Sequence, residues 1–487
     1  MLRRHLGILN RFSPQNWLSL GIVILLATAL YLFHLDSRGL WIDEFISLRD
    51  AHDISFNRGR LLYYILLKIW INFGQSDAWL RSLGVLFAIS AVVLLYQLGN
   101  NLLTKRVGFI AALMLALSPL FINHAQEVRY YSMSVSLGIA GSLALAKSLD
   151  ASTSPINHML WGLFRVLAIL TTPLNAALLI ADGIIILLKY YRQPRRLIHF
   201  ALSGLLMVGM LIPVAISIRD SAGAHRVNLP VPGLNDLVRE IRILTAFSYP
   251  PEPPYMTRLV HVYIFTTLLV LAVAILRKRQ SEPFQWLVIW TFVPVGIIFI
   301  FSHLLFSIWN TRYIMLILPY LLILMAVGFL EIWSRWHRLA WVILLIYTLT
   351  VSSGLVVYYT SSRRYMGASD HYRTTVEILN KYDQPGDVIV WSIIHNMSEP
   401  LKHYYQGTAR IVLRPRMEIR SHHHKIERTT IEAWLSELPE FPSRLWLVCG
   451  PGITQDDELF YEVLNDMFLI QEHYTVEGFN IFLVTSI

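Results

Sequence analysis

The sequence predicts a polytopic α-helical membrane protein that ends in a small α/β domain. Of its 487 residues, 55% are hydrophobic and only 15% are charged, and the mean hydropathy is +0.50. A soluble protein cannot bury that much apolar surface. Apolar runs long enough to cross a bilayer recur over residues 17–359. Beyond residue 360 the runs shorten, and short apolar strands alternate with helical patterns.

Apolar runs of roughly 17–22 residues predict about eleven membrane spans. The two runs on either side of Pro173 leave an alternative, because this proline could kink one long segment instead of separating two. One long segment would reduce the count by one and invert every later span. The expected spans cover residues 17–35, 80–98, 107–123, 129–147, 159–172, 174–191, 197–217, 259–276, 285–306, 313–331 and 338–359.

The basic residues decide between these two counts, since cytoplasmic loops carry an excess of Lys and Arg. With the larger count all basic clusters fall on one side of the membrane, whereas with the smaller count the later clusters change sides. The sequence therefore predicts a cytoplasmic N-terminus and an extracytoplasmic C-terminus in an inner or plasma membrane. The clusters are Arg3-Arg4, Lys105-Arg106, Lys189 to Arg196, Arg277-Lys278-Arg279 and Arg335 to Arg338.

Two domains are expected. Residues 1–359 form the transmembrane domain, with a first external loop at 36–79 and a second long external loop at 218–258. The first loop contains an amphipathic stretch, Leu61 to Trp70, that is too short to span and suits a helix at the interface. Residues 360–487 form the extracytoplasmic α/β domain. Its helices are expected at 372–382, 431–438 and 457–467, and its strands at 388–391, 445–448, 468–474 and 479–485.

Charge and cysteine content exclude other classes of protein. The chain has 41 basic and 32 acidic residues, a net charge of +9. In a membrane protein this excess usually lies in cytoplasmic loops, and no basic–aromatic cluster argues for a nucleic acid partner. The lone Cys449 excludes an intramolecular disulfide and a cysteine-based metal site. Arg165 falls inside an expected span, where it either faces the bundle or reaches the headgroups.

Four polar clusters fall on the outer side of the predicted topology, and two of them adjoin helix ends next to the hydrocarbon. Acids and arginines that converge at a membrane surface suit a lipid substrate that carries phosphate. The arginine fork binds phosphate oxygens, and a carboxylate can act as a general base. The clusters are Asp43-Glu44, Gln126-Glu127-x-Arg129-Tyr130, Asn310-Thr311-Arg312-Tyr313 and Asp370-x-x-Arg373.

These motifs, in this order, resemble those of the GT-C membrane glycosyltransferases. The most similar kinds are the protein O-mannosyltransferase-like and aminoarabinose-transferase-like enzymes. The resemblance rests on Trp41-x-Asp43-Glu44 after the first span, Leu62-Tyr63-Tyr64 before the interfacial helix and Ser118-Pro119…Gln126-Glu127-x-Arg129-x-Tyr131. Asn310-Thr311-Arg312-Tyr313…Pro319 and Asp370-His371-Tyr372-Arg373 are similar to later motifs of the family.

The resemblance implies a GT-C-like fold and transfer of a sugar from a polyprenyl-phosphate donor to an extracytoplasmic glycan, lipid or protein. In such enzymes the acid after the first span is the catalytic carboxylate, here Asp43 with Glu44 beside it. A base at this point would take the proton of the attacking hydroxyl, and inversion by single displacement is expected. Arg129 or Arg312 would stabilise the leaving phosphate. The expected substrate-binding residues are Arg60, Tyr63, Tyr64, His124, Glu127, Arg129, Arg312 and Tyr313.

The chain departs from the family at one motif. Many relatives have His-Pro-Pro-Leu-Tyr-Tyr where this chain has Gly59-Arg60-Leu61-Leu62-Tyr63-Tyr64. Arg60 could supply a cation in place of the missing histidine, and His124 is another possible substitute. Some relatives use a divalent metal ion, but no closed set of ligands around Asp43 shows one here.

Other interpretations of the same residues remain open. Asp43 and Glu44 could be a solvated pair that caps an interfacial helix, and Glu127 with Arg129 could be an ion pair that fixes two helix ends. Arg312 could anchor its span at the headgroups. At the level of function, the alternatives are a lipid or glycan transporter or flippase, and a non-catalytic envelope-assembly subunit. Transporters usually have homologous halves and polar residues at mid-span, whereas the polar clusters of this chain lie at one surface.

Overall fold

The computed structural model describes residues 14–54, 59–149, 155–221, 229–246, 254–360, 371–393, 397–414, 428–438, 444–450, 457–476 and 478–486. The chain divides into two compact units. The first, called the helical unit, consists of Met1–Leu35 and Asp50–Ser362. The second, called the tail unit, consists of Asp36–Arg49 and Arg363–Ile487.

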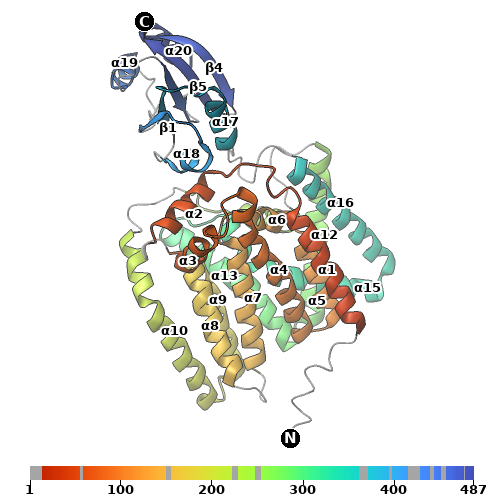
Figure 1. Cartoon of the computed structure of the whole chain (residues 1–487). Helices are drawn as coiled ribbons and strands as arrows, with labels where there is room; N and C mark the ends of the chain where they lie inside the picture. The colour runs from red at the N-terminus through yellow and green to blue at the C-terminus, as the bar shows by residue number, and fades with distance from the viewer. Residues whose placement is uncertain are drawn as a thin grey trace. The chain divides into compact units, whose positions relative to one another are not determined.

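Long helices that pack side by side make up the helical unit (Figure 1). Their starts are fixed by side-chain caps where the sequence offers them. Ser76 caps α4 and Thr104 caps α5, each accepting a hydrogen bond from a backbone N–H of the first turn. The α-helices are α1 (Pro14–Leu32), α3 (Leu61–Ile71), α4 (Asp77–Leu102), α5 (Lys105–Ala116), α6 (Pro119–Ala125), α7 (Tyr131–Ser148), α8 (Pro155–Thr171), α9 (Ala176–Tyr190), α10 (Pro194–Ser221), α11 (Leu234–Ala246), α12 (Pro254–Lys278), α13 (Glu282–Leu304), α14 (Thr311–Ile314), α15 (Leu318–Arg335) and α16 (His337–Thr360), and the 3₁₀ helices are η4 (Pro173–Asn175) and η5 (Met315–Ile317).

The helical unit is that of a multi-pass membrane protein. Among the described residues, seven helices are long and apolar enough to cross a bilayer, or eight if the bent pair α5 and α6 is one span. Every expected span coincides with helix, including α1, α7 and α8, which those seven do not include. The count of eleven therefore stays a prediction.

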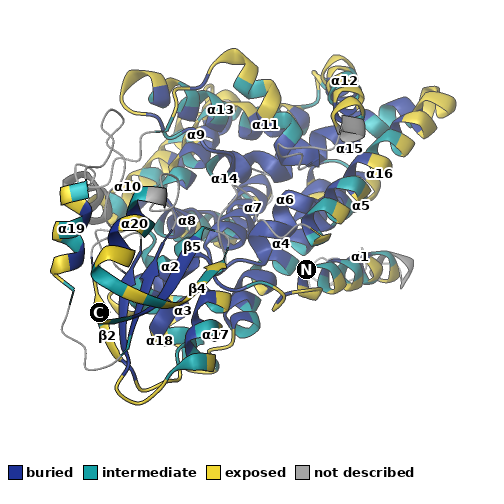
Figure 2. Ribbon diagram, turned by 90° about the horizontal axis from the view of Figure 1, so that it is seen from above, coloured by how far each residue is buried: buried dark blue, intermediate teal, exposed yellow. Residues whose placement is uncertain are grey.

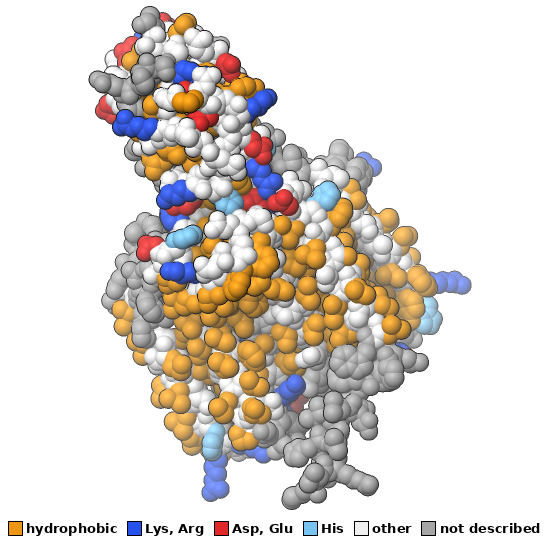
Figure 3. Space-filling model, viewed as in Figure 1, with side chains coloured by type: hydrophobic (Ala, Val, Ile, Leu, Met, Phe, Trp, Pro, Cys, Tyr) orange, Lys and Arg blue, Asp and Glu red, His pale blue; other side chains and the backbone are white. Residues whose placement is uncertain are grey.

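The outside of the helical unit is apolar and its centre is tightly packed. Buried residues concentrate around α4, α6 and α7, while the outer faces of the peripheral helices are exposed (Figure 2). Hydrophobic side chains dominate the exposed surface of this unit (Figure 3). Leu206, Phe265 and Trp341 are between 60% and 70% exposed. Such a surface is stable next to lipid and not next to water.

An ion pair inside the bundle shows that the chain turns at Pro173. Arg165 of α8 bonds Asp182 of α9 through Nε–Oδ2 at 2.6 Å and Nη2–Oδ1 at 2.9 Å. In one continuous helix these residues would lie about 25 Å apart. The two segments are therefore separate antiparallel helices, joined through η4.

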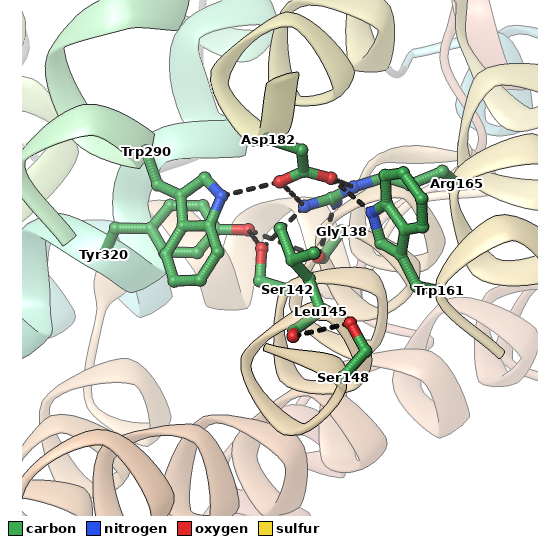
Figure 4. A network of polar contacts seen from close by, with 9 residues as sticks. All are labelled: Gly138, Ser142, Leu145, Ser148, Trp161, Arg165, Asp182, Trp290 and Tyr320. Atoms are coloured by element: carbon green, nitrogen blue, oxygen red, sulfur yellow. Dashed lines mark hydrogen bonds and ion pairs between the residues drawn. The ribbon is translucent and has the colours of Figure 1, made fainter. Parts of the chain in front are cut away.

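The same pair organises a wider polar network, which we call the clasp (Figure 4). Asp182 also accepts hydrogen bonds from the indoles of Trp161 and Trp290, each at 2.7 Å. Arg165 also donates to the Ser142 hydroxyl at 2.7 Å and to the Gly138 carbonyl at 2.9 Å. Tyr320 bonds both Ser142 and Gly138. The clasp joins α7, α8, α9, α13 and α15, and Arg165 faces the bundle.

The tail unit is built on a five-stranded sheet in the order β2-β1-β3-β5-β4. The strands β1, β2 and β3 are parallel, and β5 pairs antiparallel with both β3 and β4. Because successive side chains point to opposite faces, Val388 and Val390 face α19 and α20. The elements are α17 (Tyr372–Tyr382), β1 (Val388–Ser392), α18 (Glu399–Tyr404), β2 (Arg410–Leu413), α19 (Arg428–Ser436), β3 (Leu445–Cys449), α20 (Asp457–Met467), β4 (Phe468–Val476) and β5 (Phe479–Ser486).

A segment from near the N-terminus completes the tail unit. It contains the start of α2 (Ile42–His52), and the Phe45 ring lies 5.6–6.0 Å from the rings of Tyr372, His403 and Tyr404. The Leu40 N–H donates to the Tyr404 hydroxyl at 2.8 Å. Arg373 fixes the beginning of the same segment by an ion pair with Asp36 at 3.1 Å. Asp370, the partner in its motif, lies outside the described residues.

Candidate functional site

The segment with Glu127 follows a sharp bend between α5 and α6. Ser118 caps α6 by accepting a hydrogen bond from the Phe121 N–H at 3.3 Å, and Pro119 occupies the first turn. Proline cannot continue the preceding helix, and the two helices meet at 63°. The short α6 then ends at Ala125, so residues 126–130 lie in irregular backbone before α7.

Glu127 is buried and held on both oxygens. Its Oε1 accepts from the Asn123 amide and its Oε2 from His124 Nδ1, each at 3.0 Å. Below this turn, α4 approaches so closely that a Cβ at Gly84 would lie 2.6 Å from the Ala125 carbonyl oxygen. The turn therefore has a fixed position and leaves no room for a larger residue at Gly84.

The neighbouring Gln126 fastens the turn to two other helices. Its amide nitrogen donates to the Tyr31 and Phe33 carbonyls at the end of α1, each at 2.8 Å. Its carbonyl oxygen accepts from the Tyr358 hydroxyl of α16 at 2.6 Å. These bonds satisfy backbone groups that the end of a helix leaves open. Gln126 is thus accounted for by structure.

Three arginines from distant parts of the chain converge beside this turn. The Arg60 guanidinium lies 4.6 Å from the centre of the Tyr130 ring, and that of Arg129 lies 5.5 Å from it. Arg312 acts electrostatically on the same tyrosine and lies 5.7 Å from the Tyr313 ring. We call this group the arginine–tyrosine cluster, and its members are Arg60, Tyr63, Tyr64, Arg129, Tyr130, Tyr131, Arg312 and Tyr313.

The cluster borders a small pocket. Tyr130, Tyr131, Arg312 and Tyr313 line one part of it, and Thr172 lies among the other lining residues. Arg312 is placed by α14, whose start is capped by Asn310 through a bond from the Arg312 N–H at 3.2 Å. Three positive charges at one place, beside aromatic rings and hydroxyls, have the chemistry to bind an anion with several oxygens.

His124, which could take the place of the histidine missing from the family motif, also lies near the arginine–tyrosine cluster. The His124 ring is 4.7 Å from the Tyr131 ring, so His124 connects Glu127 to the cluster. All the expected substrate-binding residues thus lie in the helical unit and form one connected set. Asp43 and Glu44 lie in the tail unit.

The two adjacent acids of α2 have different surroundings. Glu44 is fully buried, and its Oε2 accepts from the backbone N–H of Trp41 at 3.1 Å. The Glu44 N–H in turn donates to the Trp41 carbonyl at 2.9 Å. This is the glutamate half of a capping box, in which a third-position acid reaches back to the start of its helix. The Asp43 side chain is half-buried.

One buried acidic residue near the arginine–tyrosine cluster was not predicted from the sequence. Glu240 of α11 is only 4% exposed, and its Oε2 has no hydrogen-bond partner among the described residues. Burial raises the pKa of this carboxyl, while Thr311 and Arg239 oppose the shift. The sequence does contain a signal, because Glu240 lies on the same helical face as the buried Ile243 and Leu244.

No metal site follows from the described residues, where no group of three or more His, Cys, Asp or Glu side chains could hold an ion. The residues 422–424, all histidine, lie outside the part of the chain that the structure describes.

Comparison with solved structures shows the fold. The chain is similar to ArnT from Cupriavidus metallidurans bound to undecaprenyl phosphate, with 12% identity, a TM-score of 0.61 and coverage of 97% of this chain and 98% of ArnT. It is also similar to AglB from Archaeoglobus fulgidus in complex with an inhibitory peptide and a dolichol-phosphate, with 12% identity, a TM-score of 0.55 and coverage of 96% and 74%.

A third similar structure is the arabinofuranosyltransferase AftD from Mycobacteria, with 13% identity and a TM-score of 0.50. The match covers 98% of this chain and 40% of AftD. No protein-family model and no curated protein matches the chain. The predicted GT-C-like membrane fold, with a small C-terminal sheet, is confirmed by these likenesses.

Proposed function

We propose that this protein is a membrane glycosyltransferase that moves a sugar from a polyprenyl-phosphate carrier to an acceptor outside the cytoplasm. The observation that carries the proposal is the convergence of Arg60, Arg129 and Arg312 beside Tyr130. This convergence occurs on a fold shared with ArnT bound to undecaprenyl phosphate and AglB in complex with a dolichol-phosphate. The cluster matches the chemistry of a lipid phosphate.

In the proposed reaction the acceptor hydroxyl attacks the anomeric carbon of the donor sugar. The new bond joins the acceptor oxygen to that carbon, and the bond from the carbon to the phosphate oxygen breaks. The polyprenyl phosphate leaves with the electron pair, and the arginines stabilise its developing charge. Asp43 takes the proton of the attacking hydroxyl. A single displacement of this kind inverts the anomeric configuration.

The local geometry of α2 supports Asp43 over Glu44 as the base. The Glu44 carboxylate accepts from the Trp41 N–H and so stabilises the start of the helix. A carboxylate that gives up this bond to take a proton would leave a buried N–H without its acceptor. Asp43 lies half-buried on the same turn. Glu127, bonded by Asn123 and His124, is assigned a positioning role.

A transfer assay tests the proposal. Purified protein is given a panel of labelled polyprenyl-phosphate sugars, and Asp43→Asn is compared with the wild type. We expect kcat to fall by about 10²- to 10⁴-fold, the usual contribution of a general base. Glu44→Gln is the matched control, because the amide oxygen can still accept from the Trp41 N–H and transfer should remain close to that of the wild type.

Other outcomes would count against the proposal. If the wild type consumes no donor in the panel, the glycosyltransferase assignment fails for those donors. If Glu44→Gln loses transfer and Asp43→Asn retains it, the base is Glu44. Movement of an intact labelled lipid across proteoliposomes, equal in the wild type and Asp43→Asn, would favour a flippase. An Asp43→Asn variant that fully supports envelope assembly without any transfer would favour a non-catalytic subunit.

A further inference from the structure

A second polar site lies in the helical unit, away from the arginine–tyrosine cluster. A cavity of about 670 Å³ is formed by the ends of α4, α7 and α9 and the starts of α8, α10 and α13. This volume falls within the range of small-molecule sites. The cluster adjoins the start of α7, whereas the cavity adjoins its end. Since α7 has 18 residues, about 27 Å separate the two ends.

The cavity is basic. Lys147, Lys189 and Arg196 line it, and Glu282 is its only acidic residue among the described lining residues. Lys189 pairs with Glu282 at 2.8 Å. The lining therefore keeps a net charge of about +2 at neutral pH. An anion is the kind of ligand that these charges attract.

Aromatic rings hold two of the cations in place. The Lys189 ammonium lies 4.9 Å from the Trp286 ring, and the Arg196 guanidinium lies 5.4 Å from the Tyr190 ring. Both rings are buried, and the Tyr190 hydroxyl donates to the Leu149 carbonyl at 2.8 Å. These two rings form the floor of the cavity and hold the cations above them. Less side-chain freedom is therefore lost when a ligand binds.

Further donors suit the oxygens of a phosphate. Asn101, Asn157 and Gln193 line the cavity with side-chain amides. Gln193 directly precedes α10, and Arg196 lies in its first turn. The N-terminal end of a helix carries a partial positive charge. Arginine, lysine and amide N–H groups are the donors that bind phosphate oxygens in proteins.

The apolar surface beside the cavity favours a phosphate that belongs to a lipid over a soluble phosphate. Leu187 and Leu188 of α9 are 52% and 61% exposed, and Ile198 of α10 is 55% exposed. These residues lie within one turn or so of Lys189 and Arg196 in the sequence. Acyl chains next to a phosphate in the cavity would meet this apolar surface. Lys189 and Arg196 also belong to a basic cluster that the positive-inside rule places in the cytoplasm.

We propose that this cavity binds the phosphate of an anionic phospholipid of the leaflet that faces the basic clusters. Basic pockets between membrane helices are known to bind such headgroups. Lys147, Lys189 and Arg196 contact the phosphate, Trp286 and Tyr190 form the floor, and the acyl chains lie along α9 and α10. This binding does not depend on the proposed transfer reaction.

Native mass spectrometry of the full chain in detergent tests the proposal. The protein is titrated with phosphatidylglycerol, with phosphatidylcholine and with inorganic phosphate. We compare the wild type with Lys147→Gln/Arg196→Gln and with the control Arg192→Gln/Arg195→Gln. Both double variants remove two exposed positive charges from the same region, but only the first pair lines the cavity. Lys189 is kept, so its pair with Glu282 remains.

For the wild type we expect retention of phosphatidylglycerol in preference to phosphatidylcholine. The cavity variant should bind phosphatidylglycerol roughly 30-fold more weakly, about fivefold for each charge. The control should stay close to the wild type. Equal weakening in both double variants would overturn the site. Binding of inorganic phosphate that only the cavity variant loses, without preference for phosphatidylglycerol, would overturn the lipid assignment and favour a soluble phosphate.

Discussion

Glu240 is a carboxyl group whose burial has a measurable consequence. Its folded-state pKa is raised above the ordinary value of 4.5, with desolvation as the largest cause. The folded protein therefore binds more protons than the unfolded chain between that value and the raised pKa. Stability falls as pH rises through this window and stays lower above it. Replacement by a neutral group of the same shape should remove this loss.

We therefore expect Glu240→Gln to raise the unfolding temperature at about pH 8 and to leave it nearly unchanged at about pH 4. Thermal unfolding of both proteins over this pH range measures the difference. Asp236→Asn is the matched control on the same helix, since the new side chain can still accept from the Gly233 N–H. A Glu240→Gln variant that is less stable than the wild type at high pH would contradict the argument.

At the level of single residues, the sequence shows which side chains carry chemistry but not which of them are already engaged. The adjacency of Asp43 and Glu44 left the choice between them open. The bond from the Trp41 N–H to Glu44 favours Asp43, and it depends on where the helix begins. Glu240 was missed because residues 218–258 were expected to form a loop, so the helical face that it shares with Ile243 and Leu244 was not considered.

The clasp shows how one ion pair can hold several elements. Arg165 and Asp182 are both fully buried, and each makes four hydrogen bonds within the network. A buried charge that keeps all its partners is tolerated, whereas a charge that loses its counter-ion is strongly destabilising. The stability of the bundle should therefore depend on the pair more than on either charge alone.

We predict that Asp182→Leu destabilises the protein by about 3–5 kcal/mol, because it leaves the Arg165 guanidinium buried without its carboxylate. The double variant Arg165→Leu/Asp182→Leu should be less destabilised than the sum of the two single changes. Unfolding in detergent measures each variant. Thr171→Val, which removes only a bond to the Leu167 carbonyl of the same helix, is the control and should cost about 1 kcal/mol or less. Additive effects would contradict a coupled pair.

Elements with a clear periodic pattern were predicted closely. The helices over 372–382 and 457–467 match α17 and α20 at both ends. The short α18 and the strand β2 were missed. In β2 the residues Arg410 to Leu413 include three apolar residues in a row, so the strand shows no alternation of apolar and polar residues. Ile411 and Leu413 are 40% and 38% exposed at the edge of the sheet. Short edge elements are defined by their neighbours more than by their own sequence.

Convergence of distant segments is a property of the whole molecule. The sequence placed the polar motifs on one side of the membrane, and the structure brings Arg60, Arg129 and Arg312 to one set of tyrosines. The side of the membrane on which a motif lies follows from counting spans and charges. The distances between the arginines and the tyrosines depend on how α3, α7 and α14 pack. The grouping of residues 36–49 with the tail was likewise not readable from local patterns, since it depends on contacts such as Phe45 with Tyr372.

The orientation of the chain is the last expectation to test, and the lone cysteine makes the test direct. Cys449 is fully buried in β3. Because it is the only cysteine in the sequence, a protein in which alanine replaces it contains no thiol. New cysteines are introduced one at a time at Arg195, Arg279 and Lys381, which are all exposed. A membrane-impermeant maleimide is then applied to sealed right-side-out vesicles.

We expect labelling at Lys381 in sealed vesicles, and labelling at Arg195 and Arg279 only after the vesicles are opened. Arg195 lies between the sixth and seventh expected spans, and Arg279 lies between the eighth and ninth. Two spans separate them, so both are expected on the cytoplasmic side. The turn at Pro173 supports this arrangement, since the Arg165–Asp182 pair requires two antiparallel helices there. Labelling of Arg195 and Arg279 from opposite sides would show that the spans between them are odd in number, and the predicted topology would fail.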